Sequence, residues 1–145
     1  MKNELYVEKV QNVERVEMVS DFEDLVIYQQ SRELAKQIYA VTRQGEFKHD
    51  LRFVQQIRAA VGSISDNIAE GFERQGRKEF LQFLYIAKGS CGELRSQVNR
   101  AFDVQFIDNE TYEVLYSDIK KIAAGIHNMI QKLKTFEHQG SKYNR

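Results

Sequence analysis

The sequence predicts an all-α protein folded as an antiparallel up-down-up-down four-helix bundle. Four long segments repeat apolar residues at steps of three and four, and no segment alternates with period two for long enough to form a strand. The 145 residues include no proline, which is typical of a mostly helical chain because an interior proline costs a helix about 3 kcal/mol. Short connections between the four segments favour antiparallel neighbours.

The first predicted helix begins near Ser20 or Asp21, either of which is suited to cap it, and Gly45 is suited to end it. The second begins at Asp50. The predicted buried face of the first helix comprises Leu25, Tyr28, Leu34, Ala35, Ile38 and Val41. That of the second comprises Leu51, Val54, Ile57, Val61, Ile64, Ile68 and Phe72.

The third predicted helix begins at about Arg77, and the fourth begins at Asp108 or Asn109, either of which is suited to cap it. The buried face of the third comprises Phe80, Leu84, Ala87, Cys91, Leu94, Val98 and Ala101. That of the fourth comprises Tyr112, Leu115, Ile119, Ile122, Ile126, Met129 and Leu133.

These boundaries predict one bundle over residues 22–137, preceded by an extension over 1–21 and followed by a flexible tail over 138–145. Valine at every third position of the extension is compatible with a helix, a docked arm or a loose tail. The role of the extension stays open.

Composition narrows the classes of function. The formal net charge is zero, with an acidic excess in residues 1–24 and a basic excess in residues 25–100, which argues against a chain built simply to coat nucleic acid. Cys91 is the single cysteine, so no intrachain disulfide or cysteine-based zinc site forms, and we expect a cytoplasmic protein. No apolar run approaches the roughly 18 residues of a membrane span.

The stretch "GFERQGRK", residues 71–78, is close to the phosphate-binding loop G-x-x-x-x-G-K-[ST]. It lacks a preceding strand, Arg77 follows the second glycine, and Glu79 stands where a hydroxyl is needed. We therefore predict a corner between two helices. Arg74, Arg77 and Lys78 lie beside the free amides of the third helix, and both a phosphate contact and a solvated corner remain open.

No catalytic, cofactor or metal site is predicted. Glu70 and Glu93 fall on neighbouring helices but lack the Glu-x-x-His pattern of dimetal bundles, and His127 has no carboxylate three residues before it. Cys91 lies on the apolar face of its helix, where a thiol packs as a small hydrophobic group.

Small residues gather on the second and third helices, including Gly62 and Ser63 on one and Gly89 and Gly92 on the other. Glycine inside a helix costs up to about 1 kcal/mol relative to alanine, so this pattern predicts close approach of the two backbones. The residues assigned to this structural seam are Asn67, Glu70, Gly71, Ser90 and Glu93. Apolar residues outside the main stripes predict burial of a second face against another subunit.

Two long stretches, "FEDLVIYQQSRELAKQIYAVT" and "QIRAAVGSISDNIAEGFERQGRKEFLQFLYIAKGSCGELRSQV", carry a family resemblance. They resemble the four-helix-bundle family of 23S ribosomal RNA intervening-sequence proteins, to which the accessory variability proteins of diversity-generating retroelements are related. The resemblance covers roughly residues 22–136. It implies a homopentamer, binding to structured RNA or DNA, a reverse transcriptase as partner in the retroelement branch, and no catalytic residue.

By position in the matching stretch, the resemblance implies that five basic residues contact nucleic acid: Arg74, Arg77, Lys78, Lys88 and Arg95. The chain departs from the family in having Ser65 and Asp66 where a proline is frequent, in its acidic extension, and in its neutral charge. The sequence thus predicts a non-enzymatic, oligomeric accessory protein that binds structured RNA or DNA through a modest basic surface. The alternative is a homo-oligomeric scaffold for protein partners that binds no nucleic acid.

Overall fold

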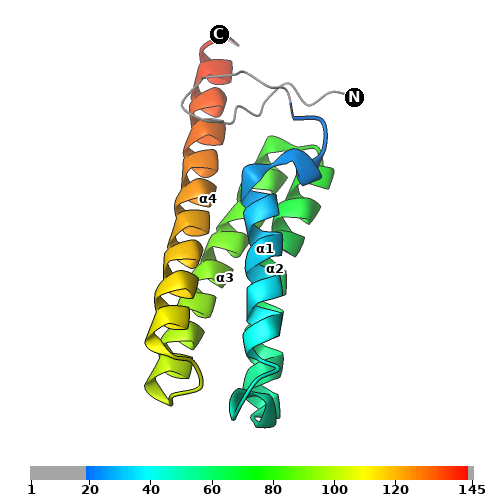
Figure 1. Ribbon diagram of the computed structural model, residues 1–145. Helices are drawn as coiled ribbons and strands as arrows, with labels where there is room; N and C mark the ends of the chain where they lie inside the picture. Colours follow the sequence, from blue (N-terminus) through cyan, green and yellow to red (C-terminus); the bar gives the residue numbers. More distant parts are fainter. Residues whose placement is uncertain (1–18, 144–145) are drawn as a thin grey trace.

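The computed structural model describes the backbone of residues 19–143 and the side chains of residues 19–135. This part of the chain holds no strand. Its four α-helices are α1 (Val26–Val41), α2 (Leu51–Glu73), α3 (Arg77–Asp103) and α4 (Asn109–Tyr143), and two single-turn 3₁₀ helices, η1 (Phe22–Asp24) and η2 (Phe47–His49), precede α1 and α2. Successive helices run antiparallel, and α1 also packs against α4 (Figure 1). The predicted fold class is confirmed.

The sequence predicts capping side chains for the first, second and fourth helices, and the second and fourth helices have them. Asp50 accepts a hydrogen bond from the backbone N–H of Phe53 at 3.1 Å, and Asp108 accepts one from Thr111 at 2.8 Å. The first helix differs, because the side chain of Asp21 caps nothing and α1 begins five residues later, at Val26. Leu25 is fully buried in an extended conformation, and this anchoring delays the helix.

The predicted buried faces form the core, with one clear exception. Leu51 is 70% exposed, because its position in the first turn of α2 points it away from the other helices. Phe47, which the sequence places in a loop, is fully buried. Its ring centroid lies 5.0 Å from those of both Phe53 and Phe106, so an aromatic cluster closes this end of the bundle.

The stretch from Gly71 to Lys78 forms the predicted corner, but its glycines act differently from expectation. Gly71 lies inside α2, where a Cβ atom would stand 2.6 Å from Cβ of Phe83, so the two helices meet closely there. Gly76 is extended, and Gln75 takes the left-handed conformation of the turn, with φ of 59°. The helix therefore ends at Glu73 rather than at a glycine.

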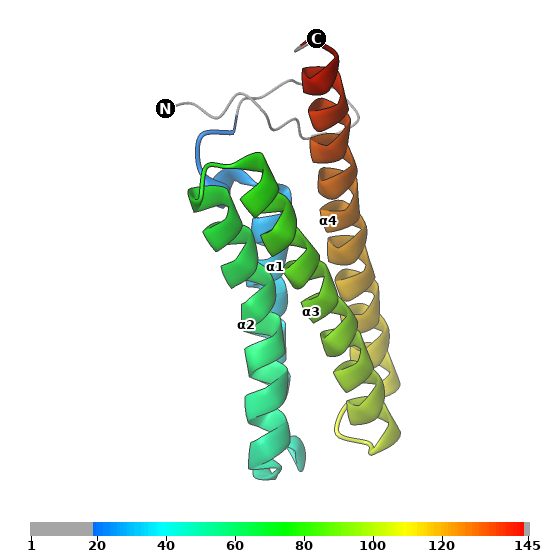
Figure 2. The ribbon, with the colours of Figure 1, turned by 180° about the vertical axis from the view of Figure 1, so that it is seen from behind.

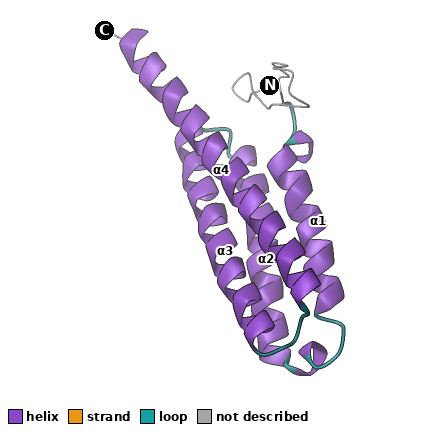
Figure 3. Cartoon of the chain, turned by 60° about the vertical axis from the view of Figure 1, so that its left-hand side comes forward, coloured by secondary structure: helices purple, strands orange, loops and turns teal. Residues whose placement is uncertain are grey.

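Two boundaries of the bundle also differ from the sequence interpretation. Val19 is buried in the core although it precedes residue 22. Helix α4 continues to Tyr143, so the backbone of residues 138–143, where a flexible tail is predicted, is helical (Figure 3). Residues 1–18, most of the predicted extension, lie outside the described residues, as do residues 144–145.

Candidate nucleic-acid interface

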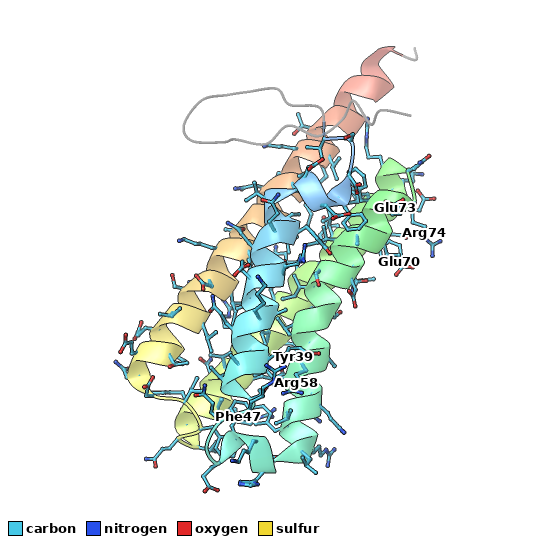
Figure 4. All side chains as sticks on the ribbon, turned by 45° about the vertical axis from the view of Figure 1, so that its right-hand side comes forward. Tyr39, Phe47, Arg58, Glu70, Glu73 and Arg74 are labelled. Carbon is cyan, nitrogen blue, oxygen red and sulfur yellow. The ribbon has the colours of Figure 1, made fainter. Side chains whose placement is uncertain are left out.

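The corner between α2 and α3 holds three of the predicted cations, in different surroundings. Arg74 donates to a carboxylate oxygen of Glu70 at 3.1 Å, and its guanidinium lies 5.4 Å from the ring centre of Phe83. Figure 4 shows Glu70, Glu73 and Arg74 together at this end of α2. Arg77 is half-buried, whereas Lys78 is exposed. Lys78 is thus the corner cation most open to a ligand.

Two further arginines are engaged within the subunit. The guanidinium of Arg58 lies 4.5 Å from the ring centre of Tyr39 and donates to the Thr42 hydroxyl at 3.0 Å (Figure 4). Arg100 lies 4.4 Å from the ring centre of Phe53. Such stacking uses the face of the guanidinium and anchors it to the bundle surface.

A second group of basic side chains follows the line where α3 meets α4. Nζ of Lys88 lies 3.2 Å from Nδ1 of His127, and because an ammonium has no acceptor, the lysine donates. Seven residues are two helical turns, so residues seven apart share a helix face. We name this group the basic seam; its members, all exposed, are Lys88, Arg95, Lys120, His127 and Lys134.

The antiparallel register of α3 and α4 sets the order of charges along the basic seam. Arg95 follows Lys88 by seven residues on α3, and Lys120 precedes His127 by seven on α4. The contact between Lys88 and His127 therefore brings Arg95 level with Lys120, so like charges face one another. Figure 2 shows α3 between α2 and α4, with its length lying against α4.

Aromatic rings stand beside the cations of the basic seam. Nζ of Lys134 lies 5.4 Å from the ring centre of Tyr85, which is 45% exposed, and Nζ of Lys120 lies 5.8 Å from that of Tyr116. Farther along, Phe102 and Tyr112 stack with centroids 4.5 Å apart. Cations alternating with exposed rings are typical of surfaces that bind nucleic-acid backbones and stack bases.

Carboxylates are absent from the middle of the basic seam. Glu93 is the one acid of α3 between Glu79 and Asp103, and Asp118 is the one acid among residues 114–135 of α4. Each stands two residues from a seam cation, about 200° around its helix and thus on another face. Among the described residues, no ion pair joins a seam cation to a carboxylate. The cations are therefore open to an external anion.

The structural seam between α2 and α3 is organised around a residue that the sequence interpretation left out of it. The hydroxyls of Ser63 and Ser90 are 2.8 Å apart, and Asn67 donates to both the hydroxyl and the carbonyl of Ser63. Asn67 and Ser90 thus meet through Ser63. Glu70 instead pairs with Arg74, and Glu93 accepts from Gln97 on its own helix.

Close approach of the backbones occurs at Gly71 but not at the other glycines of α2 and α3. A Cβ atom on Gly89 or Gly92 would meet nothing within 4 Å, and one on Gly62 would meet just the carboxylate of Asp66, at 3.9 Å. The prediction that all these glycines bring α2 and α3 together is wrong within the subunit. Gly89 and Gly92 leave an open strip on the outer side of α3.

The single thiol is buried in the core of the bundle. Cys91 is 1% exposed, and burial raises its pKa to about 11, although nearby Arg95 acts in the opposite direction. The described residues contain no group of three or more His, Cys, Asp or Glu side chains placed to hold a metal ion. No helix in this part of the chain is long and apolar enough to cross a membrane.

Comparison with known proteins identifies the family. The sequence model of the 23S rRNA-intervening sequence proteins matches residues 23–128. The chain belongs to this family. Similarity to a crystal structure at 1.70 Å resolution of a protein with unknown function, from the S23 ribosomal protein family of Bacteroides thetaiotaomicron VPI-5482, shows the shared fold, with a TM-score of 0.66 and 24% identity. The match covers 73% of this chain and 96% of that one, and no curated protein matches.

In this member of the intervening-sequence family, the five residues predicted to contact nucleic acid fall into two groups in the structure. Lys88 and Arg95 lie in the basic seam, whereas Arg74, Arg77 and Lys78 lie at the corner. Four residues in or beside the basic seam are not among the predicted nucleic-acid contacts: Tyr85, Lys120, His127 and Lys134. The spacing of seven from Lys120 through His127 to Lys134 is a signal visible in the sequence, but its alignment with Lys88 and Arg95 depends on how the helices pack.

Proposed function

We propose that this protein is a non-enzymatic accessory module that binds structured RNA or DNA through the basic seam. The observation that carries the proposal is the contact between Lys88 and His127, whose register places Arg95 level with Lys120, without an ion-paired carboxylate on the basic seam among the described residues. Clustered cations repel one another, and a phosphate backbone relieves that repulsion.

The dimensions of the basic seam suit a nucleic-acid backbone. At 1.5 Å per residue, the three α4 members of the basic seam are about 10 Å apart, and Lys120 and Lys134 at its ends are about 21 Å apart. Phosphate contacts carry little sequence information, and stacking on Tyr85 is tolerant of base identity. We therefore propose binding that is electrostatic and tolerant of sequence. Lys78 extends this surface at the corner.

A homo-oligomeric protein scaffold is the second candidate. Gly89 and Gly92 expose the backbone of α3 without contact inside the subunit, and neighbouring Ile86 is 50% exposed. Small residues beside an apolar side chain suit packing of a second copy. We also propose a homopentamer, a reverse transcriptase or other protein as partner, and the cytoplasm as compartment, on the basis of the sequence and its family resemblance.

Titration of fluorescent structured RNA and duplex DNA, followed by anisotropy at several salt concentrations, tests the proposed function. The basic-seam variant combines Lys88→Gln, Arg95→Gln and Lys120→Gln. Its matched control combines Arg32→Gln, Arg43→Gln and Lys48→Gln, three exposed cations on α1 and on the connection from α1 to α2. We expect salt-sensitive binding that the first variant weakens at least tenfold and the control changes less than twofold. Light scattering on the same samples gives the subunit number.

Equal losses in the two variants would mean that charge alone, and not the basic seam, governs binding. An oligomer that binds neither RNA nor DNA at low salt would favour the scaffold.

A further inference from the structure

A groove lies between α1 and α4 near the start of α1, on a different side of α4 from the basic seam. Its volume is about 730 Å³. Apolar residues from both helices line it, and we call them its floor: Val26, Ile27, Ala124, Gly125 and Met129. We call its polar lining residues the rim: Gln30, Lys121, Asn128, Gln131 and Lys132. An apolar floor with a polar rim suits an amphipathic segment of polypeptide.

The groove opens where α1 begins and α4 continues past it. A Cβ atom on Gly125 would stand 2.8 Å from Cγ2 of Ile27, so the two helices meet closely at this level. Helix α1 begins one residue earlier, at Val26, whereas α4 runs on to Tyr143. The continuation of α4 past the start of α1 is visible in Figure 3. This side of α4 therefore has no neighbouring α1 beyond the groove.

The described chain outside the family match lies at this end of the bundle. The match covers residues 23–128, so residues 19–22 and 129–143 of the described backbone fall outside it. The start of the described chain and the last turns of α4 lie at the same end (Figure 1). The chain before residue 19 is therefore attached at the end of the bundle where the groove lies.

The leading segment has the composition that the groove requires. Residues 1–18 carry valine at positions 7, 10, 13 and 16, and glutamate at positions 4, 8, 14 and 17, while Lys2, Lys9 and Arg15 leave a net charge of −1. The valines match the apolar floor, and the glutamates match the ammonium groups of Lys121 and Lys132 on the rim. The next residue, Val19, is 5% exposed in the core and fixes the segment's end near the first turn of α1.

We propose that residues 1–18 of this chain dock into the groove between α1 and α4, with their valines on its floor and their glutamates toward Lys121 and Lys132. The segment then completes the bundle where α1 leaves α4 uncovered. This inference does not depend on nucleic-acid binding, since the groove and the basic seam lie on different faces of α4.

Disulfide trapping in the full chain tests the docking. In a Cys91→Ala background, cysteine replaces Val7, Val10 or Val13 in turn and is paired with Asn128→Cys on the groove rim. The matched control pairs the same positions with Gln82→Cys, an exposed site on α3 at the same end of the bundle. In a glutathione buffer, we expect at least one Asn128→Cys pair to show an effective concentration about tenfold above its control.

A second set of variants tests whether the valines of the segment contact the apolar floor of the groove. In the pair that crosslinks best, substitution of the two remaining valines among positions 7, 10 and 13 by Asp should lower the effective concentration at least fivefold. Gln11→Asp with Asn12→Asp adds the same charge without removing an apolar group and should change it less than twofold. Equal crosslinking to Asn128→Cys and Gln82→Cys at all three positions, a mainly interchain product, or indifference to the valine changes would each overturn the proposal.

Discussion

The ammonium of Lys88 on α3 donates to Nδ1 of His127 on α4, across 3.2 Å, with both side chains exposed. This contact sets the register in which Arg95 and Lys120 come level with each other. The neutral imidazole, unlike a carboxylate, carries no negative charge to offset that of the lysine. The pair is thus a structural reference point for the basic seam and leaves its positive field intact.

The salt dependence of nucleic-acid binding should separate the two groups of predicted contacts. On duplex DNA, each phosphate-contacting cation contributes about −0.9 to the slope of log K against log salt. We expect Lys88→Gln and Arg95→Gln each to flatten the slope by about that amount, and Lys78→Gln to do so in part. Arg74→Gln should leave it unchanged because Arg74 is already paired with Glu70. Anisotropy titrations between about 50 and 200 mM salt measure these slopes. A larger effect from Arg74 than from Lys88 would shift the interface to the corner.

Two glycine-to-alanine changes should have opposite effects on the stability of the subunit. Gly71→Ala places a Cβ atom 2.6 Å from Cβ of Phe83 and should destabilise the fold by about 1–3 kcal/mol through overpacking. Gly89→Ala meets open space and should stabilise α3 by about 0.5–1 kcal/mol. Urea denaturation monitored by circular dichroism gives both values. If Gly89→Ala instead destabilises the protein, and does so more at higher protein concentration, a neighbouring subunit packs on the outer side of α3.

Ionisation of Cys91 should make stability fall at alkaline pH. Burial raises the pKa of the folded thiol from 9.0 to about 11, so the unfolded chain loses its proton first. The contribution of the protonated thiol is therefore complete below about pH 9 and is lost as the pH rises through about 11. The difference in unfolding free energy between the wild type and Cys91→Ala should narrow across this interval. Denaturation at several pH values measures the difference, and a constant gap would contradict the raised pKa.

Removal of the Phe47 ring should open the end of the bundle opposite the corner between α2 and α3. This ring is fully buried between Phe53 and Phe106, and a Phe→Ala change in such a site costs about 3–5 kcal/mol. Val104→Ala, at a position 52% exposed near the same end, should cost less than about 0.5 kcal/mol. Thermal unfolding compares the two variants. Similar melting temperatures for both would show that the aromatic cluster contributes little.

Much of the bundle follows from local chemistry that the sequence displays. The stripes through Ile57, Leu94 and Ile126 predict the buried faces because a helix places every third or fourth residue on one side. The caps at Asp50 and Asp108 are equally local, since each carboxylate binds an amide three residues ahead. Absence of proline and the recurring apolar steps were sufficient to predict four antiparallel helices.

Tertiary packing decided what local patterns do not contain. Phe47 joins the core from a loop because rings from α2 and the α3–α4 connection enclose it. Leu25 delays α1 because its burial outweighs helix propensity at that point. Lys88 meets His127 because α3 and α4 pack in one register, and a shift of a single turn would separate them. The sequence determined which face of each helix is buried, whereas packing determined which exposed residues become neighbours, since spacing along one helix carries no information about its partner.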